Sequence, residues 1–148
     1  MENKDVRELI KEVLDKGYLM SLATMDDGGV WVADVIYVHD DDDFNIYWMS
    51  YPNVRHSQAI LENPKVAGTI TASEQSGEEL GIQLEGIVEK IDGPRFDLAL
   101  KFYSKRKKPA PKEADDILEG HSWYCLKPKR VELIHGKLFG FEKQKLSF

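Results

Sequence analysis

The chain has 148 residues, enough for one domain with a sizeable hydrophobic core. Its composition of 42% hydrophobic and 31% charged residues is that of a soluble globular protein, and no apolar run approaches the length of a membrane span. The formal net charge of −6 argues against a nucleic-acid partner, and the single cysteine, Cys125, excludes an internal disulfide and suits a reducing compartment. We therefore expect one cytoplasmic domain over residues 1–148.

The start of the chain predicts a helix followed by a hairpin. Apolar residues over 6–14 recur at helical spacing, and Gly17 can end that helix. Two β-rich runs follow, at 18–25 and 30–38. The turn between them, at 26–29, contains Asp-Gly, which is a strong hairpin signal. An amphipathic helix and two antiparallel strands therefore open the fold.

The next segment combines a strand with a short helix. The four aspartates at 40–43 lack the ligand spacing of a calcium loop, so we expect an exposed turn there. The apolar run at 44–49 predicts a strand. Asn53 is suited to cap a helix that begins after it, and Pro64 would end that helix.

The second half of the chain is dominated by strands. The expected strands cover 65–72, 80–91, 122–126 and 130–135, with a turn at 127–129 joining the last two. A helix follows Pro94, and a shorter helix is expected over 113–118. Gly86 interrupts the longest strand and indicates a bulge or the close approach of another backbone. Strands in hairpin order with few helices imply a barrel or a sandwich.

Arg55 and His56 fall in the first turn of the helix that Asn53 would cap. At a helix start the backbone N–H groups are unpaired and the helix dipole is positive. A guanidinium, an imidazole and a nearby hydroxyl are the groups that a phosphate needs. The alternative interpretation is a solvated helix start whose charges bind nothing.

Several segments occur in a distinctive order: Tyr18–Thr24, Val30–Tyr37, Ile46–Ser50, Arg55-His56, Asn63–Thr69 and Gly81–Glu89. Their order and spacing resemble the pyridoxamine phosphate oxidase-like split β-barrel flavoproteins. Val54-Arg-His56, Gly81-Ile-Gln-Leu84 and Leu138-Phe-Gly-Phe141 are similar to a small uncharacterised subgroup of that family. The resemblance implies a mainly β fold, namely a six-stranded antiparallel Greek-key split barrel with a few peripheral helices. It also implies a homodimer with FMN bound in the groove between the subunits.

The same resemblance implies roles for particular residues. Arg55 and His56 would hold the FMN phosphate, together with the hydroxyl of Ser50. The remaining implied cofactor-binding residues lie along the flavin ring or its ribityl chain: Ala33, Asp34, Val35, Ile36, Trp48, Met49, Gln83, Phe139 and Phe141, the last two reaching from the partner subunit. The apolar tail at 138–141 has little chain after it to cover it, so we expect it to pack on the second subunit.

Each of these roles has a structural alternative. Trp48 can be a core aromatic residue, Gln83 an exposed polar one, and the tail aromatics plain dimer packing. His121, Cys125 and His135 lack the tight spacing of a zinc site, so no metal is expected. No pair of residues predicts a catalytic acid, base or nucleophile.

These observations favour an FMN-dependent reductase or oxidase that acts on an unidentified small molecule, because the flavin itself carries the chemistry. The alternatives are a flavin-binding protein for storage, sensing or electron relay, and the same fold binding haem or a deazaflavin. Asp34 stands where the vitamin-forming oxidases have further basic residues, so oxidation of pyridoxamine phosphate is not expected.

Overall fold

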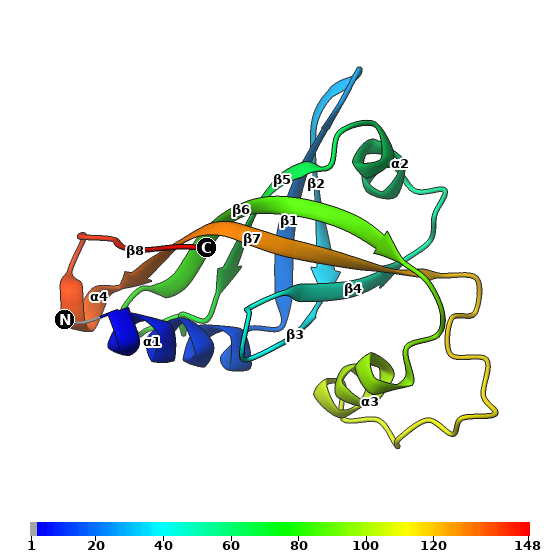
Figure 1. Ribbon diagram of the computed structural model, residues 1–148. Coiled ribbons are helices and arrows are strands. Elements are labelled where there is room, and N and C mark those ends of the chain that lie inside the picture. The colour runs from blue at the N-terminus through cyan, green and yellow to red at the C-terminus, as the bar shows by residue number, and fades with distance from the viewer. Residues whose placement is uncertain (1–2) are drawn as a thin grey trace.

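The computed structural model describes residues 3–148, with side chains from Val6 on. Helices and strands follow one another along these residues as Figure 1 shows. Their bounds are α1 Asn3–Lys16, β1 Leu19–Asp26, β2 Gly29–Ile36, β3 Val38–His39, β4 Ile46–Ser50, α2 Arg55–Glu62, β5 Lys65–Thr71, β6 Leu80–Ile91, α3 Phe96–Lys105, β7 Ser122–His135, α4 Gly136–Phe139 and β8 Gln144–Ser147. None of the helices in the described part of the chain is long and apolar enough to cross a membrane.

All the strands belong to one antiparallel sheet. Its order is β2-β1-β5-β6-β7-β4-β3, and β8 pairs with the second half of β7. The sheet curls so that β2 and β4 lie close to each other without pairing, which leaves β2 with one free edge (Figure 1). Six longer strands form the curled sheet, and the short β3 and β8 add to it. The expected mainly β split barrel is confirmed.

The last two predicted strands are a single strand, β7, which pairs with β6 along its whole length. The predicted turn at 127–129 is wrong because the chain continues through Pro128 as a β-bulge. The register shifts there, between Glu85 and Gly86 on the facing strand. The predicted role of Gly86 is confirmed, since a Cβ at Gly86 would lie 2.3 Å from the Lys127 carbonyl oxygen. Only a glycine lets the two backbones come this close.

The main core lies inside the curled sheet, where α1 covers the inward face. The apolar stripe of α1 consists of Val6, Ile10, Val13 and Leu14, each at most 3% exposed. Burial of each such side chain contributes roughly 1.5–3 kcal/mol. A second, smaller core lies under α3, where Leu98 and Ala99 pack on Trp123. The two cores lie on opposite faces of β4 and β7, so these strands have no face that is wholly solvated.

Two other expectations are wrong. Residues 113–118 form turns and bends rather than a helix. The chain after Phe141 is not a free end, because it turns back as β8 and pairs with residues 130–133 of β7. Leu146 of β8 is buried in the main core, which holds the end of the chain on the barrel. The exposed turn expected at 40–43 is present.

The bulge gives a direct test of the fold. Gly86→Ala should lower the free energy of unfolding by about 2 kcal/mol or more, because the added methyl group has to displace the β7 backbone. Urea denaturation measures the change. Gly77→Ala is the matched control, since a Cβ at Gly77 meets its nearest atom at 3.6 Å. Equal stabilities for the two variants would contradict the close approach of β6 and β7.

Candidate functional site

Among the described residues, no side chain caps the start of α2. Its N-cap residue is Val54, so the predicted cap Asn53 is wrong. Asn53 lies one position too early, in a turn where the Val54 amide donates to the Tyr51 carbonyl at 3.4 Å. The first intrahelical bond runs from the Gln58 amide to the Val54 carbonyl at 3.0 Å. The amides of the first helical turn are therefore available to an acceptor from outside the helix.

Ser50 and His56 meet at this helix start. Ser50 is the last residue of β4, where it pairs with Ser122 and is 8% exposed. The Ser50 hydroxyl oxygen lies 2.9 Å from Nε2 of His56. Burial lowers the pKa of His56. The neutral imidazole is therefore favoured, and the positive helix dipole at this position also opposes protonation of the ring.

Arg55 is held by a residue from the hairpin of β1 and β2. Its Nε and Nη2 atoms donate to the two carboxylate oxygens of Asp26 at 3.1 and 3.2 Å. The hydrogen bonds from Arg55 hold the pKa of the Asp26 carboxyl below its ordinary value. The guanidinium also lies 4.6 Å from the centre of the Trp31 ring. Asp26 and Trp31 thus fix the direction of Arg55, and sequence reasoning assigned neither of them to the site.

Two more hydroxyl groups near this region have no internal partner. Ser57, in the first turn of α2, is 1% exposed, and Thr24 of β1 is 2% exposed. Neither hydroxyl oxygen has a hydrogen-bond partner among the described residues. Buried polar groups are rarely left unpaired, and such exceptions often mark a ligand or water position. The region around α2 therefore has more donors than the protein itself uses.

The predicted ring-binding strand is the free-edged strand β2. Ala33–Ile36 lie in its second half, and Asp34 accepts a hydrogen bond from the Ser21 hydroxyl at 2.7 Å. Because β2 ends the strand order, one edge of its backbone has no strand partner within residues 3–148. That edge faces the seam toward β4, at whose end Ser50 lies. The structure thus brings 33–36 to the same seam as Ser50.

Trp48 and Met49 do not share a surface. They alternate on β4, and Trp48 is fully buried in the main core, where it stacks on Tyr124 at 6.0 Å. Met49 points to the opposite face and packs under α3. Trp48 therefore lies in the core, where its Nε1 has no hydrogen-bond partner among the described residues. Met49 lines a separate cavity beside Phe102 rather than the start of α2.

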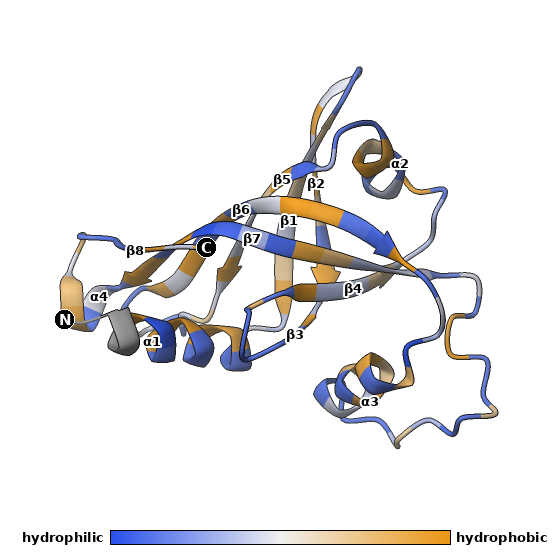
Figure 2. Ribbon diagram, in the orientation of Figure 1, coloured by the Kyte–Doolittle hydropathy of each residue, from blue (hydrophilic) through white to orange (hydrophobic). Residues whose placement is uncertain are grey.

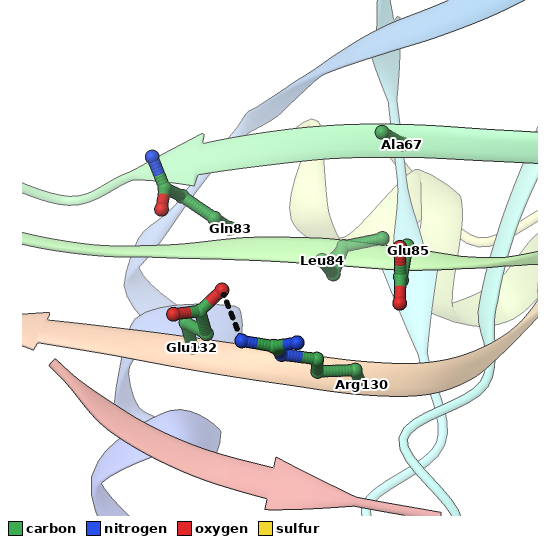
Figure 3. A pocket seen from close by; sticks show the side chains of 6 residues that line it. All are labelled: Ala67, Gln83, Leu84, Glu85, Arg130 and Glu132. Carbon is green, nitrogen blue, oxygen red and sulfur yellow. Dashed lines mark ion pairs between the residues drawn. The ribbon is translucent and has the colours of Figure 1, made fainter.

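Gln83 lies on the outward face of the sheet, as Figure 3 shows. The register aligns it across neighbouring strands with Thr69, Ser21 and Asp34. Strands are about 4.8 Å apart, so these three steps separate Gln83 from Asp34 by about 14 Å. The Gln83 side-chain oxygen accepts from Lys143 at 2.8 Å. Gln83 is thus outside the α2 site of its own subunit.

Phe139 and Phe141 lie at the far end of the barrel. The first residue of β7 pairs with Ser50, and α4 follows its last residue. A strand of 14 residues is about 45 Å long when straight, so neither aromatic ring can reach α2 of its own chain. Figure 1 shows α4 and α2 at opposite ends of the molecule. Phe139 is partly buried against the main core, whereas Phe141 is 97% exposed.

Other reactive side chains do not join this group. Cys125 is buried, and burial raises the pKa of its thiol, which makes it a poor nucleophile. Asp15, His39 and Asp41 gather elsewhere, where Nε2 of His39 lies 3.1 and 3.0 Å from their carboxylate oxygens. Burial lowers the pKa of His39 despite the two carboxylates, so the neutral imidazole is favoured in this arrangement.

A model of the pyridoxamine 5'-phosphate oxidase family matches residues 6–135. The chain belongs to this family. A UPF0306 protein of Yersinia pseudotuberculosis is 31% identical over 107 residues, which are 72% of this chain and 73% of that protein. Two solved structures share the family fold: a haem-binding protein from Mycobacterium smegmatis (TM-score 0.68, 16% identity, 95% of this chain and 57% of that one) and an F420 reductase (TM-score 0.65, 17% identity, 82% and 94%).

The burial of His56 gives a pH dependence of stability. Its pKa in the folded protein is below that in the unfolded chain, so the unfolded state binds the proton more tightly. Stability should therefore fall as the pH is lowered from 7 through the folded pKa. His56→Gln should reduce this loss, measured by urea denaturation from about pH 7 to about pH 5. An unchanged pH slope in the variant would show that His56 does not contribute.

Proposed function

We propose that this protein binds FMN with its phosphate at the start of α2 and acts as an FMN-dependent oxidoreductase on a small molecule. The observation that carries the proposal is the uncapped helix start, where the His56 ring meets the Ser50 hydroxyl and Asp26 holds the adjacent Arg55 side chain. Helix amides, a guanidinium and a hydroxyl are complementary to a terminal phosphate. The family match supports a cofactor-binding role for this surface.

Arg55 can bind a phosphate without leaving Asp26. A guanidinium has five N–H donors, and Asp26 uses two of them, on Nε and Nη2. The remaining donors, on Nη1 and Nη2, are free for phosphate oxygens. Asp26 reduces the local positive charge but orients the donors, so recognition depends on direction as well as on charge.

The bound dianion would change the protonation of His56. In the free protein burial favours the neutral imidazole. A phosphate nearby favours the imidazolium and raises the pKa. FMN binding would then take up a proton, with Ser50 remaining a hydrogen-bond partner of the ring.

The free edge of β2 suits the flavin ring. The backbone groups of 33–36 on that edge can bond to the polar rim of an isoalloxazine, and the seam toward β4 gives it a place to lie. When bound, FMN supplies the hydride or electron transfer. The protein then only has to bind, orient and shield the ring, which agrees with the lack of an assigned catalytic acid or base.

A second subunit would complete the site. Phe141 is almost fully exposed, and the hairpin of β1 and β2 exposes Val30 (71%) and Val32 (61%). Figure 2 shows hydrophobic segments along this hairpin beneath its hydrophilic tip. Isolated apolar side chains need no partner, but apolar groups at both ends of one molecule suit an isologous dimer. In such a homodimer the tail of one subunit covers the flavin bound by the other.

Haem or a deazaflavin is the second candidate cofactor, because structural neighbours are a haem-binding protein and an F420 reductase. The absorption spectrum of the purified protein distinguishes FMN from haem. Flavin gives two bands in the near-ultraviolet and blue, whereas haem gives a Soret band. Bleaching of a flavin spectrum by NADH or NADPH, and recovery with an acceptor, would separate an enzyme from a carrier.

The phosphate assignment predicts a selective loss. Arg55→Ala should weaken FMN binding by roughly 10- to 100-fold, because charged hydrogen bonds to the phosphate are lost. Riboflavin, which lacks the phosphate, should bind as before. Calorimetric titration of both ligands measures the difference. Arg95→Ala is the matched control, since Nε and Nη2 of Arg95 donate in the same way to the two carboxylate oxygens of Asp97 on α3. Equal losses for FMN and riboflavin would refute the assignment.

The shared site predicts that assembly and cofactor retention are linked. Phe141→Ser should weaken the dimer and release FMN while leaving the barrel folded, because the side chain is 97% exposed in the single chain. Light scattering with in-line absorbance reports mass and flavin together. Leu100→Ser, at an exposed position on α3, is the control. A monomeric Phe141→Ser that still holds FMN tightly would show that the site belongs to one subunit.

A further inference from the structure

A second cavity lies on the other face of the end of β4. It has a volume of about 260 Å³ and is enclosed by α3, by the segment 106–121 and by Met49. Ser50, the next residue along, points instead toward His56. The last residues of β4 thus separate this cavity from the start of α2. The proposed FMN function makes no use of it.

The base of the cavity is apolar. Met49, Phe102 and Ile117 line it, and all three belong to the second core or pack against it. Ile117 is 5% exposed, so this surface is a continuation of the core rather than a solvated loop. A ligand that enters the cavity would therefore bury an apolar body.

The rim is cationic. Its two cations are Arg106 and Lys108, and the His121 ring lies beside them in the lining. Neither Arg106 nor Lys108 makes an ion pair or a side-chain hydrogen bond to another described side chain, while the Arg106 guanidinium lies 5.4 Å from the centre of the Phe102 ring. Glu119 is an acidic member of the lining and offsets part of this charge. In a chain with a net charge of −6, these two cations make the mouth of the cavity locally positive.

The backbone holds this rim in place. Lys107 follows α3 with a left-handed φ of 56°, and the Lys107 and Lys108 amides close the helix by donating to Ser104 and Tyr103 at 3.0 and 2.9 Å. His121 is fixed by stacking on Tyr51 at 3.8 Å and by a bond from its Nδ1 to the Leu118 carbonyl at 2.8 Å. The left-handed backbone conformation of Lys107 is one that glycine adopts more easily than lysine does.

We propose that this cavity binds a small organic acid, with its apolar body on the base and its carboxylate at Arg106 and Lys108. An apolar body alone would not need the cationic rim, and an inorganic anion alone would not need the apolar base. The combination selects a ligand with both parts. This site is separate from the proposed FMN site, and the inference does not depend on it.

The test uses 2-naphthoate as the probe and 2-naphthamide as its uncharged equivalent. Naphthoate should shift the methyl NMR signals of Met49 and Ile117, and naphthamide should bind at least about fivefold more weakly, because it lacks the charge. The double variant Arg106→Gln/Lys108→Gln should weaken naphthoate binding about tenfold and leave naphthamide binding unchanged. Lys107→Gln, which keeps both rim cations, should change naphthoate binding by less than about twofold.

Other outcomes would overturn the proposal. Equal binding of the two probes would show an apolar cavity that does not select an acid. A loss in Lys107→Gln as large as in the double variant would show diffuse attraction to a basic surface. Shifts at α2 residues, abolished by Arg55→Ala, would place the probe in the other site. Circular dichroism of each variant confirms that it is folded.

Discussion

The shared bend of β6 and β7 is the constraint on which the rest of the structure depends. At Gly86 the two backbones come so close that no side chain fits, and Pro128 lies opposite. Proline cannot donate a hydrogen bond in a sheet, so it is tolerated at a bulge. On its other side β7 pairs with β4 before Pro128 and with β8 after it. Pro128 therefore interrupts neither pairing, and the curl of the barrel follows from its position.

This curl explains how the site is assembled. The first half of β7 pairs with β4, whose last residue is Ser50. Helix α2 follows β4 in the chain and precedes β5. The hairpin of β1 and β2 reaches the same helix start and contributes Asp26 and Trp31. Residues from four separate segments meet there, although none of them is close to all the others in sequence. The positions of Ser50 and Met49 on opposite faces of β4 also separate the two binding regions of the molecule.

Local patterns predicted the strands well because alternation of apolar and polar residues is set by burial on one face. Ile82 and Leu84 point inward and Glu85 outward, as their spacing indicates. His56 and Ser50 meet as the resemblance implied, whereas the Arg55 side chain is held by Asp26. The close approach of the two backbones at Gly86 was predicted from an isolated glycine in an otherwise regular strand pattern.

The failures have a common cause, which is context beyond the local sequence. Asn53 has cap chemistry, but the turn before it places the helix start one residue later. Pro128 is typical of a turn, and its place in a β-bulge becomes clear only when the register of β7 against β6 is known. Asp26 is 29 residues from Arg55, and its position in a hairpin turn already explains its presence. No pattern in either segment indicates that the two side chains meet.

The free edge of β2 has a consequence for handling the protein. An unpaired strand edge with exposed Val30 and Val32 is a template to which other extended chains can add. Asp26 and Asp27 at the hairpin tip and Asp34 further along place negative charge beside that edge, and charge of one sign opposes such stacking. Solubility should therefore be poorest near the pI of about 5.2, where the protein as a whole loses its net charge. In the subunit without cofactor or partner, loss of that charge removes the opposition to strand pairing at this edge.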